Sequence, residues 1–246
     1  MIQLYNEILY RPLANALVFL TALVPGHDVG LAIILLTLLV RIIIFPLTHR
    51  SLVTQLKLKE LEPEISKIKV QHPSTEEQGR KMMELYQAHG VNPLSGCFLL
   101  IIQLPILIAL YQVFWHGIFE NSVPLYSFIQ APEALQTKFL GLIELSSKSW
   151  ILAALAGLSQ FLQIKLSNPL IPKTSANFKE ELSRAISIQS LYIFPILIFF
   201  ISFRFPAALP LYWTASNVFA TLHEAVVRQR ARLRYGTGGT KDKRID

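Results

Sequence analysis

Long apolar stretches restrict what this chain can fold into more than any other feature of its sequence. Of its 246 residues, 52% are hydrophobic and only 16% are charged, a composition outside the usual range of soluble domains. A helix needs about 20 apolar residues to cross about 30 Å of hydrocarbon, because each residue adds about 1.5 Å. We therefore predict an all-α integral membrane protein with five transmembrane helices, at residues 31–47, 94–116, 150–166, 187–203 and 208–226.

Lysines and arginines between these stretches predict the orientation of the chain, because cationic loops near span ends stay in the cytoplasm. Seven lie in residues 48–93, four in 165–186 and seven from Arg228 onward, whereas the opposing segments hold four. This asymmetry predicts that the N-terminus is outside and the C-terminus is cytoplasmic.

The first 25 residues carry a polar side chain at every fourth position, which is the spacing of one helical face. We interpret residues 1–25 as an amphipathic helix that lies in the outer interface of the membrane. A signal peptide is the alternative, since an apolar run follows the arginine of this segment, although no convincing small-x-small cleavage pattern follows. The polar residues are Gln3, Glu7, Arg11 and Asn15.

Residues 49–92 are charged, yet apolar residues persist there at helical spacing. Ser74 followed by Glu77 is a capping box that predicts the start of a second helix, and Gly90 predicts its end. We expect a cytoplasmic helical hairpin that is either a solvated connector or a mobile arm that contacts a partner. The charged candidates for such contacts are Lys57, Lys59, Glu60, Glu64, Lys67, Arg80 and Lys81.

Arg41 lies within the first apolar stretch, where a charge at the bilayer centre costs roughly 2.5–3.5 kcal/mol. Each polar residue in a span is, taken singly, more often a helix–helix hydrogen bond than a functional group. Together they predict a polar cavity inside the bilayer, where an unpaired guanidinium stays hydrated. No acidic residue lies in the core of a span, so a salt bridge would require Glu224 or a loop carboxylate. The candidate cavity residues besides Arg41 are Thr37, Gln103, Gln160, Gln163, Trp213 and Asn217.

A positive charge in a low dielectric attracts anions, so a small anion transporter or channel is one possible function class. The five stretches show no internal repeat, which argues against the architecture common among transporters. An intramembrane enzyme is disfavoured because no Ser/His, paired-Asp or metal constellation lies within the spans. No metal site and no cofactor are expected.

Three stretches closely resemble the YidC family of membrane protein insertases: LAIILLTLLVRIIIFPLTHRS, MMELYQAHGVNPLSGCFLLIIQLPILIALYQVF and LYIFPILIFFISFRFPAALPLYWTASNVFA. The resemblance implies a five-helix core, here residues 26–227, around a hydrophilic groove that is open to the cytoplasm and to lipid. It also implies that Arg41 is the groove arginine and that Tyr212 and Trp213 are aromatic residues that contact the substrate. The extra N-terminal span and large periplasmic domain of many Gram-negative members are lacking, as in a compact bacterial form.

The resemblance further implies that the protein inserts nascent membrane proteins and helps them fold, without being an enzyme. A passenger would dock its polar, often acidic segment beside Arg41, so that the segment meets amides and water halfway across the membrane. Expected partners are nascent membrane proteins, membrane lipids, the ribosome and the Sec translocon, at the bacterial plasma or inner membrane. The basic tail, residues 228–246, is expected to contact anionic lipid or, without sequence specificity, ribosomal RNA. Its candidate contacts are Arg228, Arg230, Arg232 and Arg234.

Overall fold

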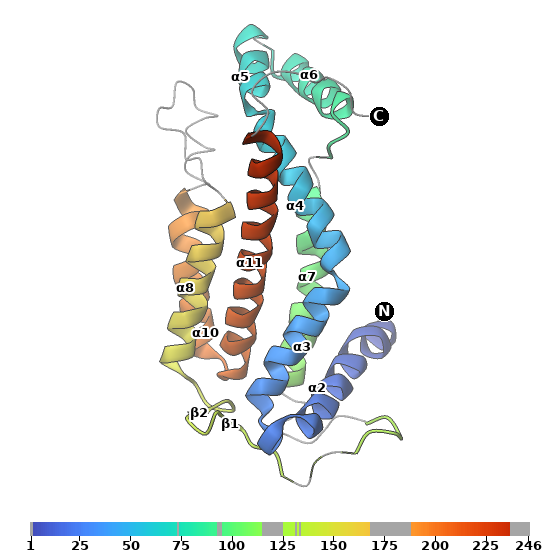
Figure 1. Ribbon diagram of the computed structural model, residues 1–246, viewed down its shortest axis with the longest axis vertical. Coiled ribbons are helices and arrows are strands. Elements are labelled where there is room, and N and C mark those ends of the chain that lie inside the picture. The colour runs from blue at the N-terminus through green and yellow to red at the C-terminus, as the bar shows by residue number, and fades with distance from the viewer. Residues whose placement is uncertain are drawn as a thin grey trace. The chain divides into compact units, whose positions relative to one another are not determined.

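The computed structural model describes residues 2–72, 74–92, 95–114, 125–130, 132, 134–167 and 188–236. Over these ranges the chain is mostly helical and has one short two-stranded sheet (Figure 1). It divides into two compact units. The first comprises Met1–Ile43 with Pro105–Glu224, and the second comprises Ile44–Leu104 with Ala225–Asp246.

The helices are distributed over both units. The first unit contains α1 (Ile2–Tyr5), α2 (Arg11–Leu23), α3 (Val29–Ile43), α8 (Trp150–Ser167), α10 (Phe194–Arg204) and the strands β1 (Lys138–Phe139) and β2 (Ile143–Glu144). The second contains α4 (Phe45–Glu60), α5 (Glu62–Gln71) and α6 (Thr75–Ala88). Both units share α7 (Ser95–Gln112) and α11 (Ala208–Gly236).

Prolines determine where several helices change pitch or break. A π-helical turn, Asn6–Tyr10, precedes Pro12, and a second, Gln189–Ile193, precedes Pro195. Proline lacks a donor and its ring collides with the preceding turn, and a wider π turn relieves both problems. At Pro46 the helix breaks instead, so the predicted span 31–47 is not one helix: α3 ends at Ile43 and α4 begins at Phe45.

The other stretches predicted as spans are helical wherever the structure describes them. Helix α8 matches 150–166 closely, α7 covers most of 94–116, and Gln189–Arg204 covers most of 187–203. By length and hydropathy, α8 is the one described helix that qualifies as a membrane span, and the broken pair of α3 and α4 would add a second. The mostly helical character is therefore confirmed, and the number of spans stays a prediction.

The N-terminal helix ends at Leu23, close to the predicted boundary, but its faces differ from the simple amphipathic pattern. Asn15 is buried, and its Oδ1 accepts a hydrogen bond from the Tyr126 backbone N–H at 2.8 Å. Leu4 and Ile8 are exposed instead. The polar stripe thus anchors a distant loop as well as facing outward.

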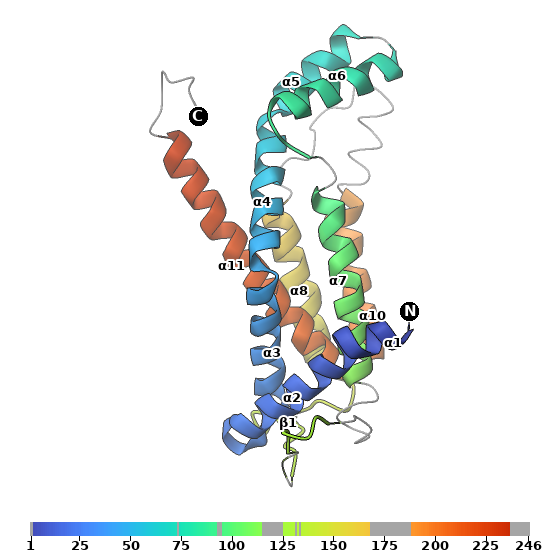
Figure 2. The same cartoon turned by 90° about the vertical axis from the view of Figure 1, so that its right-hand side faces the viewer.

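Strand β1 lies beside the start of α3 (Figure 2), and the side chain of Asp28 joins the two segments. Its Oδ1 accepts hydrogen bonds from the backbone N–H groups of Gly30 and Leu31 at 2.7 and 3.1 Å, as an N-cap does. Its Oδ2 accepts one from the Leu140 N–H at 2.7 Å. A single buried carboxylate therefore joins two segments that are far apart in the sequence.

The same hairpin region reaches the turn between α10 and α11. The backbone N–H of Ala207 donates to the Ser147 carbonyl at 2.8 Å, and that of Ala208 donates to the Leu145 carbonyl at 3.2 Å. Leu145 is fully buried there. Residues around β1 and β2 thus tie α3 to the start of α11 at one end of the first unit.

In the second unit, α5 and α6 form the helical hairpin, and the capping prediction is half right. Ser74 occupies the N-cap position, but its side chain makes no capping hydrogen bond. Glu77 pairs with His72 instead, so the capping box is wrong. The end is as predicted: Gly90 has φ +61° and closes α6 with two reverse-turn hydrogen bonds.

Candidate functional site

Arg41 lies in the last turn of α3 and is partly exposed. Its Nε donates a hydrogen bond to the Ser216 hydroxyl of α11 at 3.1 Å, and Nη2 donates to the same oxygen. None of the ion pairs among the described residues includes Arg41. A neutral hydroxyl thus holds the guanidinium without neutralising its charge.

An amide cluster joins α8 to α11 in the first unit. Gln160 Oε1 accepts hydrogen bonds from Trp213 Nε1 at 3.1 Å and from Asn217 Nδ2 at 3.2 Å. Asn217 Nδ2 also lies 3.1 Å from the Ser159 hydroxyl, and Gln160 Nε2 donates to Gln163 Oε1 at 3.0 Å. The structure therefore brings together four of the predicted cavity residues, and these hydrogen bonds between helices also hold α8 against α11.

A cavity of about 450 Å³ opens beside this cluster, between α8 and the segment Gln189–Leu197. Its polar lining comes from both sides, whereas its remaining walls are isoleucine, phenylalanine and leucine side chains. A space of this size with several amides and hydroxyls can hold water, which needs two to four polar partners. The polar residues are Gln160, Gln163, Ser167, Gln189 and Ser190.

The remaining predicted groove residues lie apart from the amide cluster. Thr37 is buried, and its hydroxyl donates to the Ile33 carbonyl of its own helix at 2.7 Å. Tyr212 is also buried, with its ring centroid 6.5 Å from that of Phe114. Gln103 is half-exposed and belongs to the second unit, so its place in a groove stays a prediction.

Glu224 is the carboxylate that the sequence suggested as a possible salt-bridge partner of Arg41, and it is buried on α11. It accepts a short hydrogen bond from the Ser167 hydroxyl of α8, and none of the ion pairs of the described residues joins it to Arg41. The salt bridge considered from the sequence is therefore not formed within the described part of the chain.

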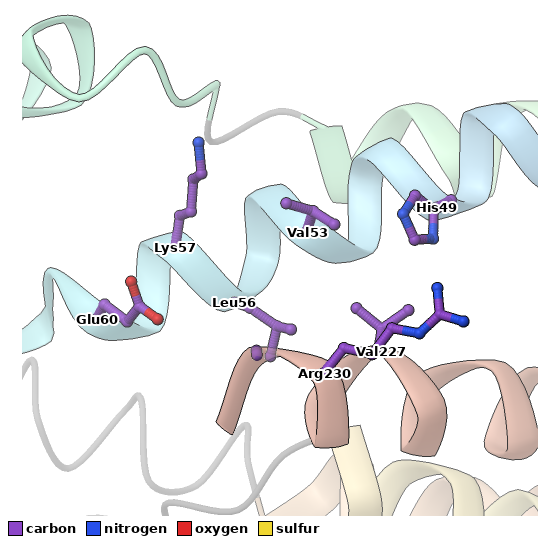
Figure 3. A pocket seen from close by; sticks show the side chains of 8 residues that line it. His49, Val53, Leu56, Lys57, Glu60, Val227 and Arg230 are labelled. Carbon is purple, nitrogen blue, oxygen red and sulfur yellow. The ribbon is translucent and has the colours of Figure 1, made fainter. Parts of the chain in front are cut away.

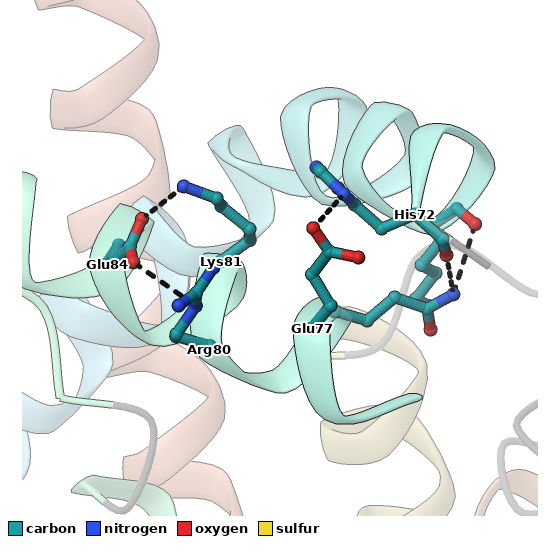
Figure 4. Close-up of polar contacts among 7 residues, drawn as sticks. His72, Glu77, Arg80, Lys81 and Glu84 are labelled. Carbon is teal, nitrogen blue, oxygen red and sulfur yellow. Dashed lines mark hydrogen bonds and ion pairs between the residues drawn. The ribbon is translucent and has the colours of Figure 1, made fainter. Parts of the chain in front are cut away.

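Charged residues of the hairpin pair mainly with one another (Figure 4). Lys81 Nζ lies 2.8 Å from Glu84, and Arg80 Nε lies 3.8 Å from the same carboxylate. The hydrogen bond from Lys81, followed by the charges of Lys81 and Arg80, lowers the pKa of Glu84. Two of the predicted contact residues are thus engaged locally. Lys59 of α4 is half-exposed, whereas Glu64 and Lys67, both of α5, are exposed.

The basic segment after residue 227 continues α11 as far as Gly236. Arg228 is half-buried and Arg230 is exposed, and Arg230 lines a pocket with Lys57 and Glu60 of α4. The side chains of Arg232 and Arg234, and the tail from 237 onward, lie outside the described part of the structure.

Ser159 and Ser216 are the site residues that reasoning from the sequence missed. Each immediately precedes a residue that was singled out, Gln160 and Asn217. Serine is common where transmembrane helices pack, so it gives little signal against an apolar background. A search for hydroxyls on the neighbouring helical faces could have found both.

Comparison with known proteins places this arrangement in a family. The family described as 60Kd inner membrane protein matches residues 19–234. A membrane protein insertase YidC from Oceanobacillus iheyensis is 32% identical over 231 residues, 92% of this chain and 84% of the relative. One from Fusobacterium nucleatum is 32% identical over 226 residues, 90% and 98% of the two chains. The membrane protein insertase MisCA of Bacillus subtilis is 32% identical over 87% of this chain and 76% of its own.

A solved structure gives the same answer for the fold. It is described as an active YidC insertase crystal structure with the first transmembrane domain resolved, and it matches with a TM-score of 0.56 at 25% identity. The match covers 91% of this chain, which spans 46% of the length of that protein's chain.

Proposed function

Because this chain belongs to the 60Kd inner membrane protein family, with the YidC insertases, its function is membrane protein insertion, and we propose that passengers dock beside Arg41. The supporting observation is that the guanidinium of Arg41 donates its hydrogen bonds to the Ser216 hydroxyl, and that no ion pair of the described residues joins it to a carboxylate. Such a group keeps its positive charge available for an anionic segment. A charge-assisted contact of this kind is worth about 1.5–3 kcal/mol.

The proposed mechanism divides the desolvation of the passenger between two surfaces. Its polar extracytosolic segment meets the charge of Arg41 and the water and amides near Gln160 and Gln163, while its apolar segment stays against lipid along α8 and α11. Because the polar segment never enters dry hydrocarbon, the barrier to each step falls. The membrane potential favours outward movement of an acidic segment by about 2.3 kcal/mol per charge at about 100 mV.

The proposal includes a topology and partners. The five apolar stretches cross a bacterial membrane with the N-terminus outside, the groove opens toward the cytoplasm, and the hairpin α5–α6 and the basic end of α11 face the cytoplasm. Nascent chains are the substrates. The ribosome, the Sec translocon and anionic lipid are proposed contacts of the hairpin and of the basic tail, because cationic side chains concentrate there.

The test is insertion into liposomes that contain the purified protein, with a single-spanning passenger whose outer segment is acidic. Protease protection measures insertion. We expect Arg41→Ala to lower insertion roughly ten-fold, as the loss of one charge-assisted contact predicts. Arg41→Lys should retain most of it, because a hydrated groove requires charge more than a bidentate geometry.

A passenger with a neutral outer segment provides one control, since it should respond little to either substitution. Arg204→Ala provides another, because it removes an exposed cation from the end of α10. Equal losses for acidic and neutral passengers, or a loss with Arg204→Ala as large as with Arg41→Ala, would contradict the proposed docking.

A further inference from the structure

A small pocket in the second unit lies between α4 and the last turns of α11, and the mechanism proposed above does not use it (Figure 3). Its volume is about 170 Å³. Its apolar lining comes from Val53 and Leu56 of α4 and from Val227 and Ala231 of α11. Val227 is buried, while the other three are half-buried and accessible from the pocket.

Opposite charges stand at the two ends of this apolar lining. His49 and Glu60 are three helical turns apart on α4, about 16 Å along its axis. The guanidinium of Arg230 is directed toward His49, whereas Lys57 points away from α11 (Figure 3). Arg230 therefore places a cation at the His49 end of the pocket, and Glu60 places an anion, with Lys57 one turn away, at the other end.

The volume limits what can bind. A cavity of about 150 Å³ lined by apolar side chains holds benzene, so this pocket accommodates one large apolar side chain. We propose that it binds a polypeptide segment in which a large apolar side chain fills the pocket and a neighbouring carboxylate pairs with Arg230. The identity of this segment rests on the proposed function: it is part of the nascent passenger, which the pocket binds on the cytoplasmic side.

An anionic phospholipid shares the negative charge but fits the pocket less well. Its two acyl chains require far more apolar space than this pocket offers, whereas one large apolar side chain fits. A peptide segment can match both ends, with a carboxylate at Arg230 and a basic residue at Glu60. The charges and the volume together favour the peptide.

Disulfide cross-linking in the reconstituted full-length protein tests this binding. With the native cysteine removed by Cys97→Ser, Ala231→Cys places a thiol in the pocket lining. Ala225→Cys is the matched control, because it lies on the same helix, is exposed and does not line the pocket. The passenger carries a cysteine next to a Phe-Asp pair. We expect its cross-link to Ala231→Cys to exceed that to Ala225→Cys.

Two further changes identify the contacts. Replacing the passenger's phenylalanine by alanine should reduce the cross-link, and Arg230→Gln should lower it roughly three-fold, as for one accessible ion pair. Arg228→Gln removes an equal charge from outside the pocket lining and should have a smaller effect.

Equal yields at the two cysteines, or a yield indifferent to Phe and to Arg230, would overturn the proposal. The proposal would also be overturned if replacing phosphatidylcholine by phosphatidylglycerol in the vesicles lowered the cross-linking yield at Ala231→Cys but not at Ala225→Cys. Such a result would mean that the anionic lipid occupies the pocket. Insertion is measured in the same vesicles. Its absence in the unmodified protein counts against the insertase mechanism, whereas insertion without the cross-link counts against the pocket alone.

Discussion

Ser216 is the residue that gives Arg41 its position. Both hydrogen bonds from the guanidinium end on its hydroxyl, and Ser216 itself is buried. A hydroxyl accepts these bonds without adding charge, so it restricts the arginine side chain while leaving its cation intact. Orientation and charge at this site therefore depend on different residues.

Replacing this hydroxyl should separate the two contributions. We expect Ser216→Ala to reduce insertion of acidic passengers by roughly three-fold to ten-fold, because the charge remains but loses its fixed position. Ser216→Thr keeps a hydroxyl and should retain most activity. The liposome insertion assay measures the activity of both variants. Equal activity of the alanine variant and the unmodified protein would show that insertion does not depend on the position that Ser216 gives to Arg41.

Several site residues were predictable because polarity inside an apolar run is conspicuous. Arg41, Gln160 and Asn217 were identified in this way, and the structure joins Gln160 to Asn217 as partners. Which polar groups pair was not predictable, because a one-dimensional pattern gives helical faces but not which helices face each other. For this reason the link from Arg41 to Ser216 emerged only in three dimensions.

Close packing of α8 and α10 depends on Gly157. A Cβ atom placed there would lie 3.1 Å from the Pro195 carbonyl oxygen and 3.2 Å from the Phe199 Cβ. We expect Gly157→Leu to lower the free energy of unfolding by about 1–3 kcal/mol, through overpacking. Thermal unfolding in detergent measures it.

Gly79 of α6 offers the matched substitution, because nothing lies within 4 Å of a Cβ placed there. Gly79→Leu should leave the unfolding temperature unchanged or raise it, since leucine favours helix over glycine by up to about 1 kcal/mol. A similar response of both variants would mean that the contact between α8 and α10 is not tight.

The β1–β2 hairpin should respond to acid through Glu144. Burial raises the pKa of this carboxyl, but hydrogen bonds donated by Ser146 and Thr137, with the charge of Lys138, lower it below the ordinary 4.5 overall. A carboxyl whose pKa is lower in the folded state stabilises the fold above about pH 4.5, and this stabilisation is lost as the pH falls through the lowered value.

Glu144→Gln should therefore reduce the difference in unfolding temperature between pH 6 and pH 3. Thermal unfolding of both proteins at the two pH values gives the comparison. An unchanged difference would show that the ionised carboxylate contributes nothing to the hairpin.

Among the elements, helix type was more predictable than helix continuity. Apolar runs identified the helices that became α8 and α11, and Gly90 ended α6 as expected. Pro46 was visible in the sequence, but whether a proline kinks, widens or breaks a helix depends on the packing around it. The break at Ile44 therefore divides the stretch predicted as one span into two helices.

For the whole molecule, the proposed orientation makes a labelling prediction. In a Cys97→Ser background, Phe128→Cys and Val70→Cys place thiols at side chains that are 78% and 86% exposed. An impermeant maleimide added to sealed cells should label the first and not the second, and inverted vesicles should reverse the result. Labelling of both positions from the same side would contradict the topology derived from the lysine and arginine distribution.

Neighbouring residues of α11 hold different partners: Ser216 binds Arg41 of α3, and Asn217 binds Gln160 of α8. Consecutive positions on a helix point about 100° apart, since a full turn takes about 3.6 residues. Any twist of α11 about its own axis must strain both attachments together. A passenger that draws Arg41 away from the Ser216 hydroxyl would therefore also disturb the hydrogen bonds that Asn217 makes to α8. Rotation of α11 would in this way couple the two polar sites.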